Sequence, residues 1–558
     1  MRMRSVWIMA LGLLIGSHSA VSRDAEVLDA AAVASPDRYG ALAAREVLKA
    51  GGNAVDAAVA AGFALAVTYP EAGNLGGGGF MTLCMHGKPY FLDYRESAPA
   101  AASPNMYLDG HGEPIAHLSV IGNLSSGVPG TVRGLYEAHR RFARLSWQRD
   151  LAPAIRDARE GFVISAQLIG IRNGSQEAFV RSTNFASYFG AMRAGVRFRQ
   201  PQLAATLTRI AQGGVREFYQ GRTAQLLVAQ MQRGPQKGLI TASDLAGYHS
   251  MWREPVVGDW HGLTLITAPP PSSGGIALLQ MLSMKQDAAA LFQGVALNSP
   301  QYVHLISEIE KRVFADRAQY LGDPDFVTVP VARLIASDYL ATRAQQIDPN
   351  KPSVSMSVRP GLEKPQTTHY SIVDRWGNAV SNTYTLNGWF GSGVVVEGAG
   401  FLLNDEMDDF SVKPGVPNMY GVVGSDANAI APFKRPLSSM TPSILLKDGK
   451  VVMVLGTPGG SRIFTSVFQV LVDVYDYRLG LSAALAQFRF HHQLLPENTL
   501  FAEPYAPFPD RLAQAMIARG YRIENQDYNG DIEAIQIVGR EPVAAADPRA
   551  RGAAMVVH

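Results

Sequence analysis

Cysteine is almost missing from this chain, which has only Cys84 among its 558 residues. A single cysteine cannot form an internal disulfide or build a cysteine-based zinc site. The sequence also has no His-Glu-x-x-His motif, so we expect no metal and no organic cofactor. It has no Gly-x-Ser-x-Gly motif either, which argues against a Ser-His-Asp hydrolase.

Charge is neither abundant nor concentrated. The formal net charge is +2 and charged residues make up 18% of the chain, without long lysine or arginine runs. A nucleic-acid groove needs a concentrated basic stripe, so we exclude nucleic acid as a partner. The hydrophobic content of 47% is ordinary for a globular protein that buries a large core.

The N-terminus has the pattern of an export signal. Arg2 and Arg4 precede an uncharged apolar run at residues 6–15, and small residues follow at positions 17, 19 and 20. This run is too short to span a bilayer, and no later stretch reaches an uncharged apolar length of about 20 residues. We therefore predict a signal peptide at residues 1–20, no membrane anchor, and a periplasmic or secreted protein.

Helical patterns dominate the first 350 residues, and strand patterns follow a polar, proline-containing loop at residues 351–366. Predicted helices cover 35–67 with a break at 51–53, most of 132–244, 276–284, 301–321, 466–475 and 482–487. One predicted strand begins at residue 80, and further predicted strands cover 90–94, 369–374, 379–386, 443–446 and 451–455. This order fits a sheet sandwich covered by helices on both faces.

The segment Gln366-Thr367-Thr368 is the most informative one. Taken alone it is an ordinary threonine-rich strand start, because threonine is common in strands. A threonine in mid-chain has no built-in base, but cleavage of the 366–367 bond would give Thr367 a free α-amine with a pKa of about 8. That amine can accept the hydroxyl proton, as in other N-terminal threonine nucleophiles.

The chain resembles the bacterial γ-glutamyltransferases, which are N-terminal nucleophile hydrolases with an αββα sandwich. The resemblance begins with T-T-H-Y-S-I-V-D at 367–374 and T-Y-T-L-N at 383–387. It continues in order over nearly the whole mature chain, in P-E-A-G-N-L-G-G-G-G-F-M at 70–81, Y-R-E-S-A-P at 94–99, V-P-G-T-V-R-G at 128–134, P-P-P-S-S-G-G at 269–275, Y-L-G-D-P-D-F at 320–326, L-L-N-D-E-M-D-D-F at 402–410, K-R-P-L-S-S-M at 434–440, G-T-P-G-G-S-R at 456–462, F-R-F-H-H-Q at 488–493 and D-P-R at 547–549.

The resemblance implies an α+β fold, the four-layer αββα sandwich, and a role for each matching residue. Thr367 would be the nucleophile, and the hydroxyl of Thr385 would hydrogen-bond to it. Gly459 and Gly460 would form the oxyanion hole, where backbone N–H groups approach a developing alkoxide. The Gly76–Gly79 run would be a backbone turn near the site rather than a phosphate loop, because no Lys-Ser or Lys-Thr follows it.

The same resemblance assigns the residues that bind the zwitterionic glutamyl head. Arg95 would clamp the α-carboxylate, as suits a planar two-pronged donor, with further donors from Ser438 and Ser439. The acceptors around the α-ammonium would be Asn387, Glu406 and Asp409. Bacterial relatives often have glutamine at the position of Glu406. Outside this context, the acidic residues 406, 408 and 409 would be interpreted as a solvated loop.

The implied protein is a precursor that cuts itself between Gln366 and Thr367. Residues 21–366 and 367–558 would form a large and a small subunit of one heterodimeric unit. The implied reaction transfers the γ-glutamyl group of glutathione or related compounds to water, amino acids or peptides. A loop at 414–425 that contains Tyr420 resembles the lid of bacterial members. Two alternatives stay open: a cephalosporin (glutaryl) acylase of the same family, and an uncleaved periplasmic binding protein.

Overall fold

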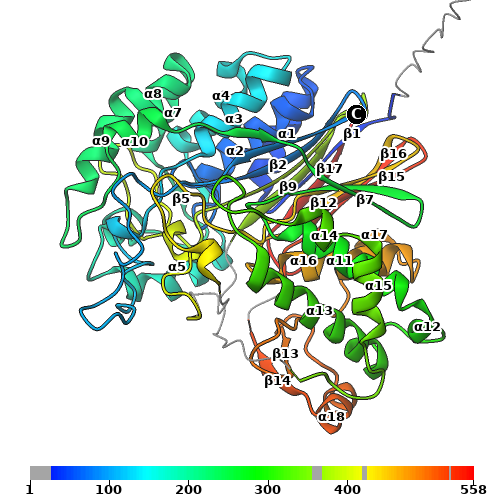
Figure 1. The fold of residues 1–558 in the computed structure, drawn as a ribbon. Coiled ribbons are helices and arrows are strands. Elements are labelled where there is room, and N and C mark those ends of the chain that lie inside the picture. The colour runs from blue at the N-terminus through cyan, green and yellow to red at the C-terminus, as the bar shows by residue number, and fades with distance from the viewer. Residues whose placement is uncertain (1–26, 355–366, 417–423, 527–528) are drawn as a thin grey trace, which may run out of the picture.

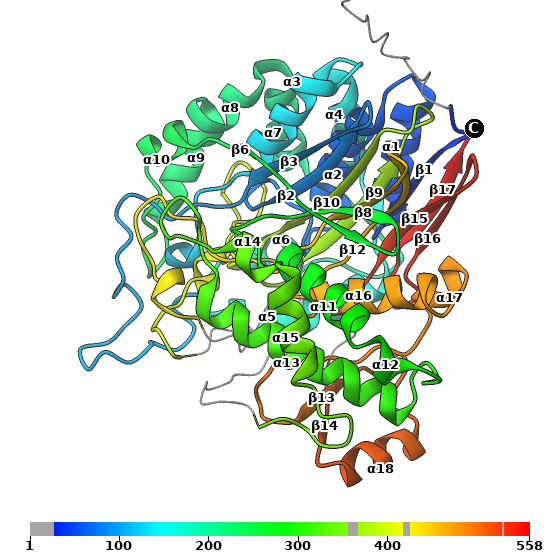
Figure 2. The same ribbon diagram turned by 45° about the vertical axis from the view of Figure 1, so that its right-hand side comes forward.

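The computed structural model describes residues 27–354, 367–416, 424–526 and 529–558. The predicted signal peptide, Gln366 and Tyr420 lie outside these ranges. Two antiparallel sheets pack face to face and helices cover both outer faces (Figure 1 and Figure 2). This is the predicted four-layer α+β sandwich. In the described ranges, no helix has both the length and the hydrophobicity that crossing a bilayer requires.

The first sheet has seven strands in the order β17-β1-β9-β10-β2-β3-β6. Their bounds are β17 Ala553–Val557, β1 Ala31–Ser35, β9 Thr368–Val373, β10 Ala379–Thr385, β2 Gly78–Met85, β3 Lys88–Tyr94 and β6 Met251–Arg253. The chain on both sides of the 366–367 bond contributes to this sheet, and β9 and β10 lie at its centre. Cutting the chain before β9 would therefore leave two fragments joined through one continuous sheet.

The second sheet has six strands in the order β16-β15-β12-β11-β8-β7. Their bounds are β16 Glu541–Ala546, β15 Glu533–Val538, β12 Lys450–Gly456, β11 Ser443–Lys447, β8 Leu263–Thr267 and β7 Val256–Trp260. Between the sheets, small apolar side chains such as Ala34 and Val373 pack against Ile444 and Val454. Their small size allows the two sheets to approach closely across a thin core.

Helices α1 Arg38–Lys49, α2 Ala54–Thr68 and α3 Thr131–Phe142 pack on the seven-stranded sheet, and α4 Trp147–Glu160 packs against α2. Helix α2 is buried along its whole length. Its first turn is closed by a capping box, in which Asn53 and Asp56 each bond the other's backbone N–H. The predicted break at 51–53 is therefore confirmed, although Ser35, which we expected in the helix, ends strand β1 instead.

Helices α11 Gly274–Asp287 and α16 Arg462–Tyr475 pack on the six-stranded sheet, and α13 Pro300–Tyr320 and α15 Ser337–Gln345 pack against α11. Further helices, α5 to α10, fill the region between 166 and 247. The predicted helices at 276–284 and 301–321 and the predicted strands after residue 368 are all confirmed. The sequence analysis missed β7, β8 and the three C-terminal strands. The strand β16 and β17 sequences, EPVAAA and AAMVV, are rich in alanine, and strand pairing overrides that weak local preference.

Candidate active site

A cavity between the two sheets and their loops brings together nearly all the predicted site residues. Its lining includes Arg95, Thr367, Thr385, Asn387, Glu406, Asp409, Ser438, Ser439 and Gly460. Together these residues span more than 300 positions of the sequence, from Arg95 to Gly460. Gly459 directly precedes the lining residue Gly460, whereas the predicted Gln366 and Tyr420 fall outside the described residues.

Strand pairing explains why the two predicted threonines meet. Strands β9 and β10 are antiparallel, with Thr368 opposite Tyr384. Continuing this register by one residue places Thr367 opposite Thr385, where side chains point to the same face of the sheet. Both residues are buried, with exposed fractions of 5% and 2%. The Thr385 hydroxyl accepts a hydrogen bond of 2.8 Å from the backbone N–H of Asn387.

The glycine-rich loop before β2 forms the wall behind Thr385. The Asn74 amide donates to the Thr385 carbonyl at 2.8 Å and accepts from the backbone N–H of Gly77 at 3.0 Å. A Cβ atom on Gly77 would lie 2.0 Å from the Thr385 carbonyl oxygen. The loop therefore needs glycine because its backbone touches the end of β10, which agrees with the predicted backbone turn.

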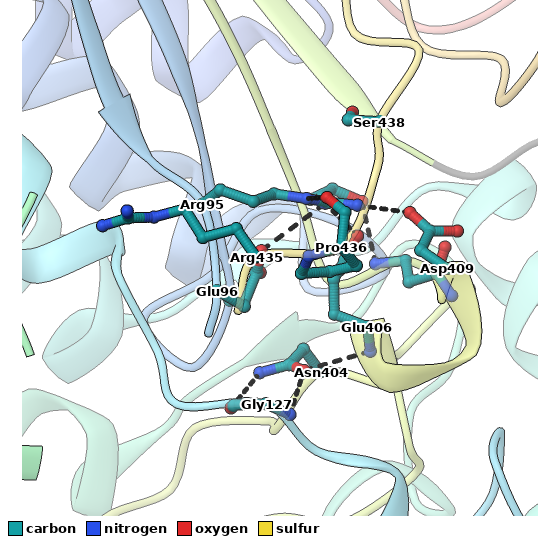
Figure 3. Close-up of polar contacts among 12 residues, drawn as sticks. Arg95, Glu96, Gly127, Asn404, Glu406, Asp409, Arg435, Pro436 and Ser438 are labelled. Atoms are coloured by element: carbon teal, nitrogen blue, oxygen red, sulfur yellow. Dashed lines mark hydrogen bonds and ion pairs between the residues drawn. The ribbon is translucent and has the colours of Figure 1, made fainter. Parts of the chain in front are cut away.

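Arg95 is fully buried and makes five polar contacts with the protein (Figure 3). Its Nε donates to the Pro436 carbonyl at 3.3 Å. Nη1 faces the carboxylates of Glu96, at 3.5 Å, and Glu406. Nη2 contacts the Asp409 carboxylate and the Leu437 carbonyl, the latter at 3.3 Å.

These contacts match the five N–H donors of a guanidinium one for one. A substrate carboxylate can therefore reach Arg95 only by displacing a protein acceptor. The contacts with Pro436, Glu96 and Leu437, at 3.3–3.5 Å, are long, whereas Glu406 and Asp409 form direct ion pairs with the guanidinium. The expected pairing of Arg95 with substrate thus requires the carboxylate cluster to rearrange.

Three buried carboxyl groups share this single guanidinium. Burial raises the pKa of Glu96 to about 7, although the Arg95 charge acts against the shift. Burial also raises the pKa of Glu406 well above its ordinary value and raises that of Asp409. Burial lowers the pKa of Arg95, but attraction to Glu406, Asp409 and Glu96 outweighs it and raises the pKa. The acidic segment is thus buried around a cation, and its interpretation as a solvated loop is wrong.

Backbone contacts hold the acidic segment in place. Asn404 exchanges two hydrogen bonds of 2.9 Å with the backbone of Gly127 (Figure 3). Its amide also donates to the Gly76 carbonyl at 2.7 Å. The backbone N–H of Glu406 donates to the same Asn404 side chain at 3.0 Å. One oxygen of Glu406, Oε2, is buried and has no hydrogen-bond partner among the described residues. This oxygen is an acceptor that a ligand cation could use.

Gly459 and Gly460 form the turn between β12 and helix α16. Their φ angles of 143° and 57° lie in the region that favours glycine. The turn leads directly into α16, whose N-terminal end carries a partial positive charge. The following Ser461 hydroxyl donates to Gln493 at 2.9 Å and lies 3.3 Å from His491 Nε2. This geometry suits stabilisation of a negative charge at the N-terminal end of α16.

Arg317, in the last turn of α13, is a cavity residue that the sequence analysis missed. Its Nε donates to the Ser273 hydroxyl at 3.0 Å and its Nη2 to the Ser439 hydroxyl at 3.1 Å. It also attracts the Asp409 carboxylate. Ser438 is held from the other side, since its carbonyl accepts from the Ser273 backbone N–H at 2.8 Å. A polar arginine within a long helix gave no local signal for such a role.

The gamma-glutamyltranspeptidase family model matches residues 40–557. The chain belongs to this family. A glutathione hydrolase proenzyme from Pseudomonas aeruginosa is 61% identical over 550 residues, which cover 98% of each chain. Another, from Escherichia coli, is 43% identical over 528 residues, covering 93% of this chain and 90% of that protein. The predicted resemblance is therefore confirmed.

Solved structures place the chain in the same fold. A gamma-glutamyltranspeptidase from Pseudomonas nitroreducens complexed with L-DON is 58% identical, with a TM-score of 0.58 over 60% of this chain and 100% of that chain. A cephalosporin acylase from Bacillus halodurans is 25% identical, with a TM-score of 0.80 over 99% of both chains. The gamma-glutamyltranspeptidase fold thus extends over proteins named for different acyl substrates, so the substrate has to be argued from the cavity.

Proposed function

We propose that this protein is a self-processing γ-glutamyltransferase and glutathione hydrolase with Thr367 as its nucleophile. The observation that carries the proposal is the position of Thr367, buried in the cavity and opposite Thr385. The bond before Thr367 would break during maturation and release the α-amine that can act as base. The high identity to glutathione hydrolase proenzymes supports this assignment.

The proposed reaction is ping-pong. The Thr367 oxygen attacks the γ-carbonyl carbon of the donor while the hydroxyl proton passes to the α-amine. The negative oxygen of the tetrahedral intermediate faces the Gly459–Gly460 turn at the start of α16. The C–N bond then breaks, the leaving amine takes the proton, and a glutamyl ester of Thr367 remains. Water, an amino acid or a peptide attacks this ester and regenerates the hydroxyl.

Binding of the glutamyl head is proposed as an exchange of ionic partners. The substrate α-carboxylate replaces carboxylates of the protein on Arg95, with Ser438 and Ser439 nearby in the lining. Glu406 and Asp409 turn from the guanidinium to the substrate α-ammonium, and Asn387 lies beside them in the same cavity. A zwitterion carries both charges that this exchange needs, so the buried ions keep partners throughout.

The same cluster argues against the glutaryl acylase alternative. A glutaryl group has a carboxylate but no α-ammonium, so it would take Arg95 and leave Glu406 and Asp409 buried without a cation. Breaking a buried ion pair in this way is costly, at about 3–5 kcal/mol. We therefore favour γ-glutamyl over glutaryl donors. The uncleaved binding protein remains the alternative if the 366–367 bond stays intact.

Cleavage into two subunits, 21–366 and 367–558, is also proposed. The solved Pseudomonas nitroreducens chain matches 60% of this one, or about 335 of 558 residues, close to the length of the predicted large subunit. We further propose that the pattern at residues 1–20 directs export to the periplasm or the medium. N-terminal sequencing of both subunits from culture fractions tests the two proposals together.

The decisive experiment compares wild-type protein with Thr367→Ala. Wild type should purify as two fragments, the smaller beginning Thr-Thr-His-Tyr, and should release p-nitroaniline from γ-glutamyl-p-nitroanilide but not from glutaryl-p-nitroanilide. Thr367→Ala should remain one chain without activity. A cleaved and active Thr367→Ala protein would exclude this nucleophile. Preference for the glutaryl compound would favour the acylase alternative. A wild-type protein that is folded but uncut would favour the binding-protein alternative.

A further inference from the structure

A second cluster of ionisable side chains lies in the outer helical layer, away from the cavity. Asp56 comes from the first turn of α2, His139 from the last turn of α3 and Asp150 from the first turn of α4. One nitrogen or oxygen atom from each residue lies within 4.8 Å of the other two. None of these helices lines the active-site cavity.

Asp56 is held rigidly by backbone donors. Its carboxylate accepts from the N–H groups of Asn53, at 2.8 Å, Arg144, at 2.9 Å, and Leu145, at 2.7 Å. These bonds tie the start of α2 to the loop between α3 and α4. They also fix the carboxylate direction, as the outer-shell hydrogen bonds of metal ligands do.

Asp150 has no such support. Its side chain is fully buried, and apart from a contact with the Asp56 carboxyl group that needs a shared proton, neither carboxylate oxygen has a hydrogen-bond partner among the described residues. The nearest ring nitrogen, Nε2 of His139, lies 3.4 Å from Asp150 Oδ2, and it is also buried without a hydrogen-bond partner in the described part of the chain. Two neighbouring buried carboxyl groups are costly unless a cation, either a proton or a metal ion, lies between them.

The His139 ring is oriented for this role. It hydrogen-bonds the Leu145 backbone and packs edge-on against Trp147, with ring centroids 5.2 Å apart. Nε2, the ring nitrogen without a hydrogen-bond partner among the described residues, lies on the Asp150 side of the ring, 3.4 Å from Oδ2. Ligating histidines usually have their other ring nitrogen bonded in this way, often to a backbone carbonyl.

We propose that Asp56, His139 and Asp150 bind one divalent transition-metal ion of the Zn²⁺ type. One imidazole with two carboxylates suits this class better than Ca²⁺ or Mg²⁺, which prefer oxygen ligands alone. Zinc bonds of 2.0–2.2 Å put tetrahedral ligands about 3.4 Å apart, the distance already present between His139 and Asp150. His139, with 14% of its side chain exposed, leaves a path for entry and for a water as fourth ligand.

The bound ion would join three helices of the layer that covers the seven-stranded sheet. Its function would be structural, because it stands apart from Thr367 and the rest of the cavity lining. The rival explanation is a proton in place of the metal, with Asp150 protonated and hydrogen-bonded to Asp56. Zinc affinity distinguishes the two, since only the metal site predicts saturable Zn²⁺ binding that depends on His139 and Asp150.

The test uses the mature protein after treatment with a chelator, with Zn²⁺ as the probe. Calorimetry and metal analysis after gel filtration should give one Zn²⁺ per protein. Asp150→Asn and His139→Gln should each weaken binding at least about tenfold, the low end for altering a metal site. The matched control is His261→Ala, an exposed histidine paired with Asp476 at 2.7 Å, which should change nothing.

Thermal unfolding gives a second readout. A ligand at about 100 times its Kd should raise the Tm of a protein of this size by roughly 2 °C. Wild type and His261→Ala should show this rise, and Asp150→Asn and His139→Gln should not. Unchanged turnover of γ-glutamyl-p-nitroanilide would show that both variants are folded. Equal Zn²⁺ binding by wild type and Asp150→Asn, or no saturable binding by wild type, would overturn the proposal in favour of the shared proton.

Discussion

Replacing Glu406 with glutamine tests the proposed exchange of partners around Arg95. The substitution keeps the shape of the side chain and one acceptor oxygen, but it removes one of three carboxyl charges that face a single guanidinium. In the proposed complex, Glu406 contacts the α-ammonium of the donor. Its Oε2 atom, buried and without a hydrogen-bond partner among the described residues, is the acceptor available for that contact.

The expected size of the effect follows from the kind of hydrogen bond that changes. A bond between charged groups contributes about 1.5–3 kcal/mol, and a neutral acceptor contributes about 0.5–1.5 kcal/mol. The difference of about 1–1.5 kcal/mol corresponds to a roughly 5- to 10-fold rise in KM. The contact is made equally in the ground and transition states, so kcat should stay nearly constant.

The assay is steady-state turnover of γ-glutamyl-p-nitroanilide by Glu406→Gln and wild type at the same pH. A donor analogue without the α-amino group is the control, because it has no ammonium for Glu406 to bind. This analogue should bind more weakly than the normal donor, and its KM should change little, or fall, in Glu406→Gln. An equal rise in KM for both compounds, or a fall in kcat without a change in KM, would refute the assignment of Glu406 to the ammonium.

Four further predictions follow from the same cavity. Gly459→Ala should lower kcat about 100- to 1,000-fold with little change in KM, because a Cβ at φ 143° displaces the oxyanion donors; a normal kcat would remove this turn from the mechanism. Arg317→Met should raise donor KM about tenfold or more through loss of a charge-assisted bond to Ser439, and lysine should not restore it. Since its pKa is raised from 4.5 to about 7 in the folded state, Glu96 should make the free energy of unfolding fall as the pH rises from about 4.5 to about 7, and Glu96→Gln should flatten this dependence in urea titrations. Thr367→Ser should still cut itself, visible as two bands on a gel, whereas an uncut Ser variant would show that the methyl group is needed.

The parts of the site that could be predicted from the sequence are those with strong local constraints. The threonine pair was predicted through the family resemblance, and its position depends on one hairpin, because the register of β9 and β10 brings Thr367 opposite Thr385. The glycine-rich loop is visible for a similar reason, because the close approach of Gly77 to the Thr385 carbonyl excludes any side chain. Such constraints can be recognised in a short stretch of sequence.

Other features depend on contacts between distant segments and have no recognisable local sequence pattern. The five acceptors around Arg95 come from residues 96, 406, 409, 436 and 437, so its saturation could not be predicted from any single motif. Arg317 was missed because an arginine near the end of a helix is ordinary by itself. The alanine-rich strands β16 and β17 were missed because their pairing, rather than their composition, decides their conformation.

The expectation that the protein needs no metal has the same weakness, because it rested on local motifs. His139 and Asp150 are 11 positions apart on two helices, and Asp56 stands on a third, so no ligand spacing of the usual kind occurs. What the fold adds is burial: among the described residues, it places an imidazole nitrogen and two carboxyl groups together without a hydrogen-bond donor for Asp150. Two neighbouring buried carboxyl groups require a cation, and the zinc titration decides whether that cation is a proton or a metal ion.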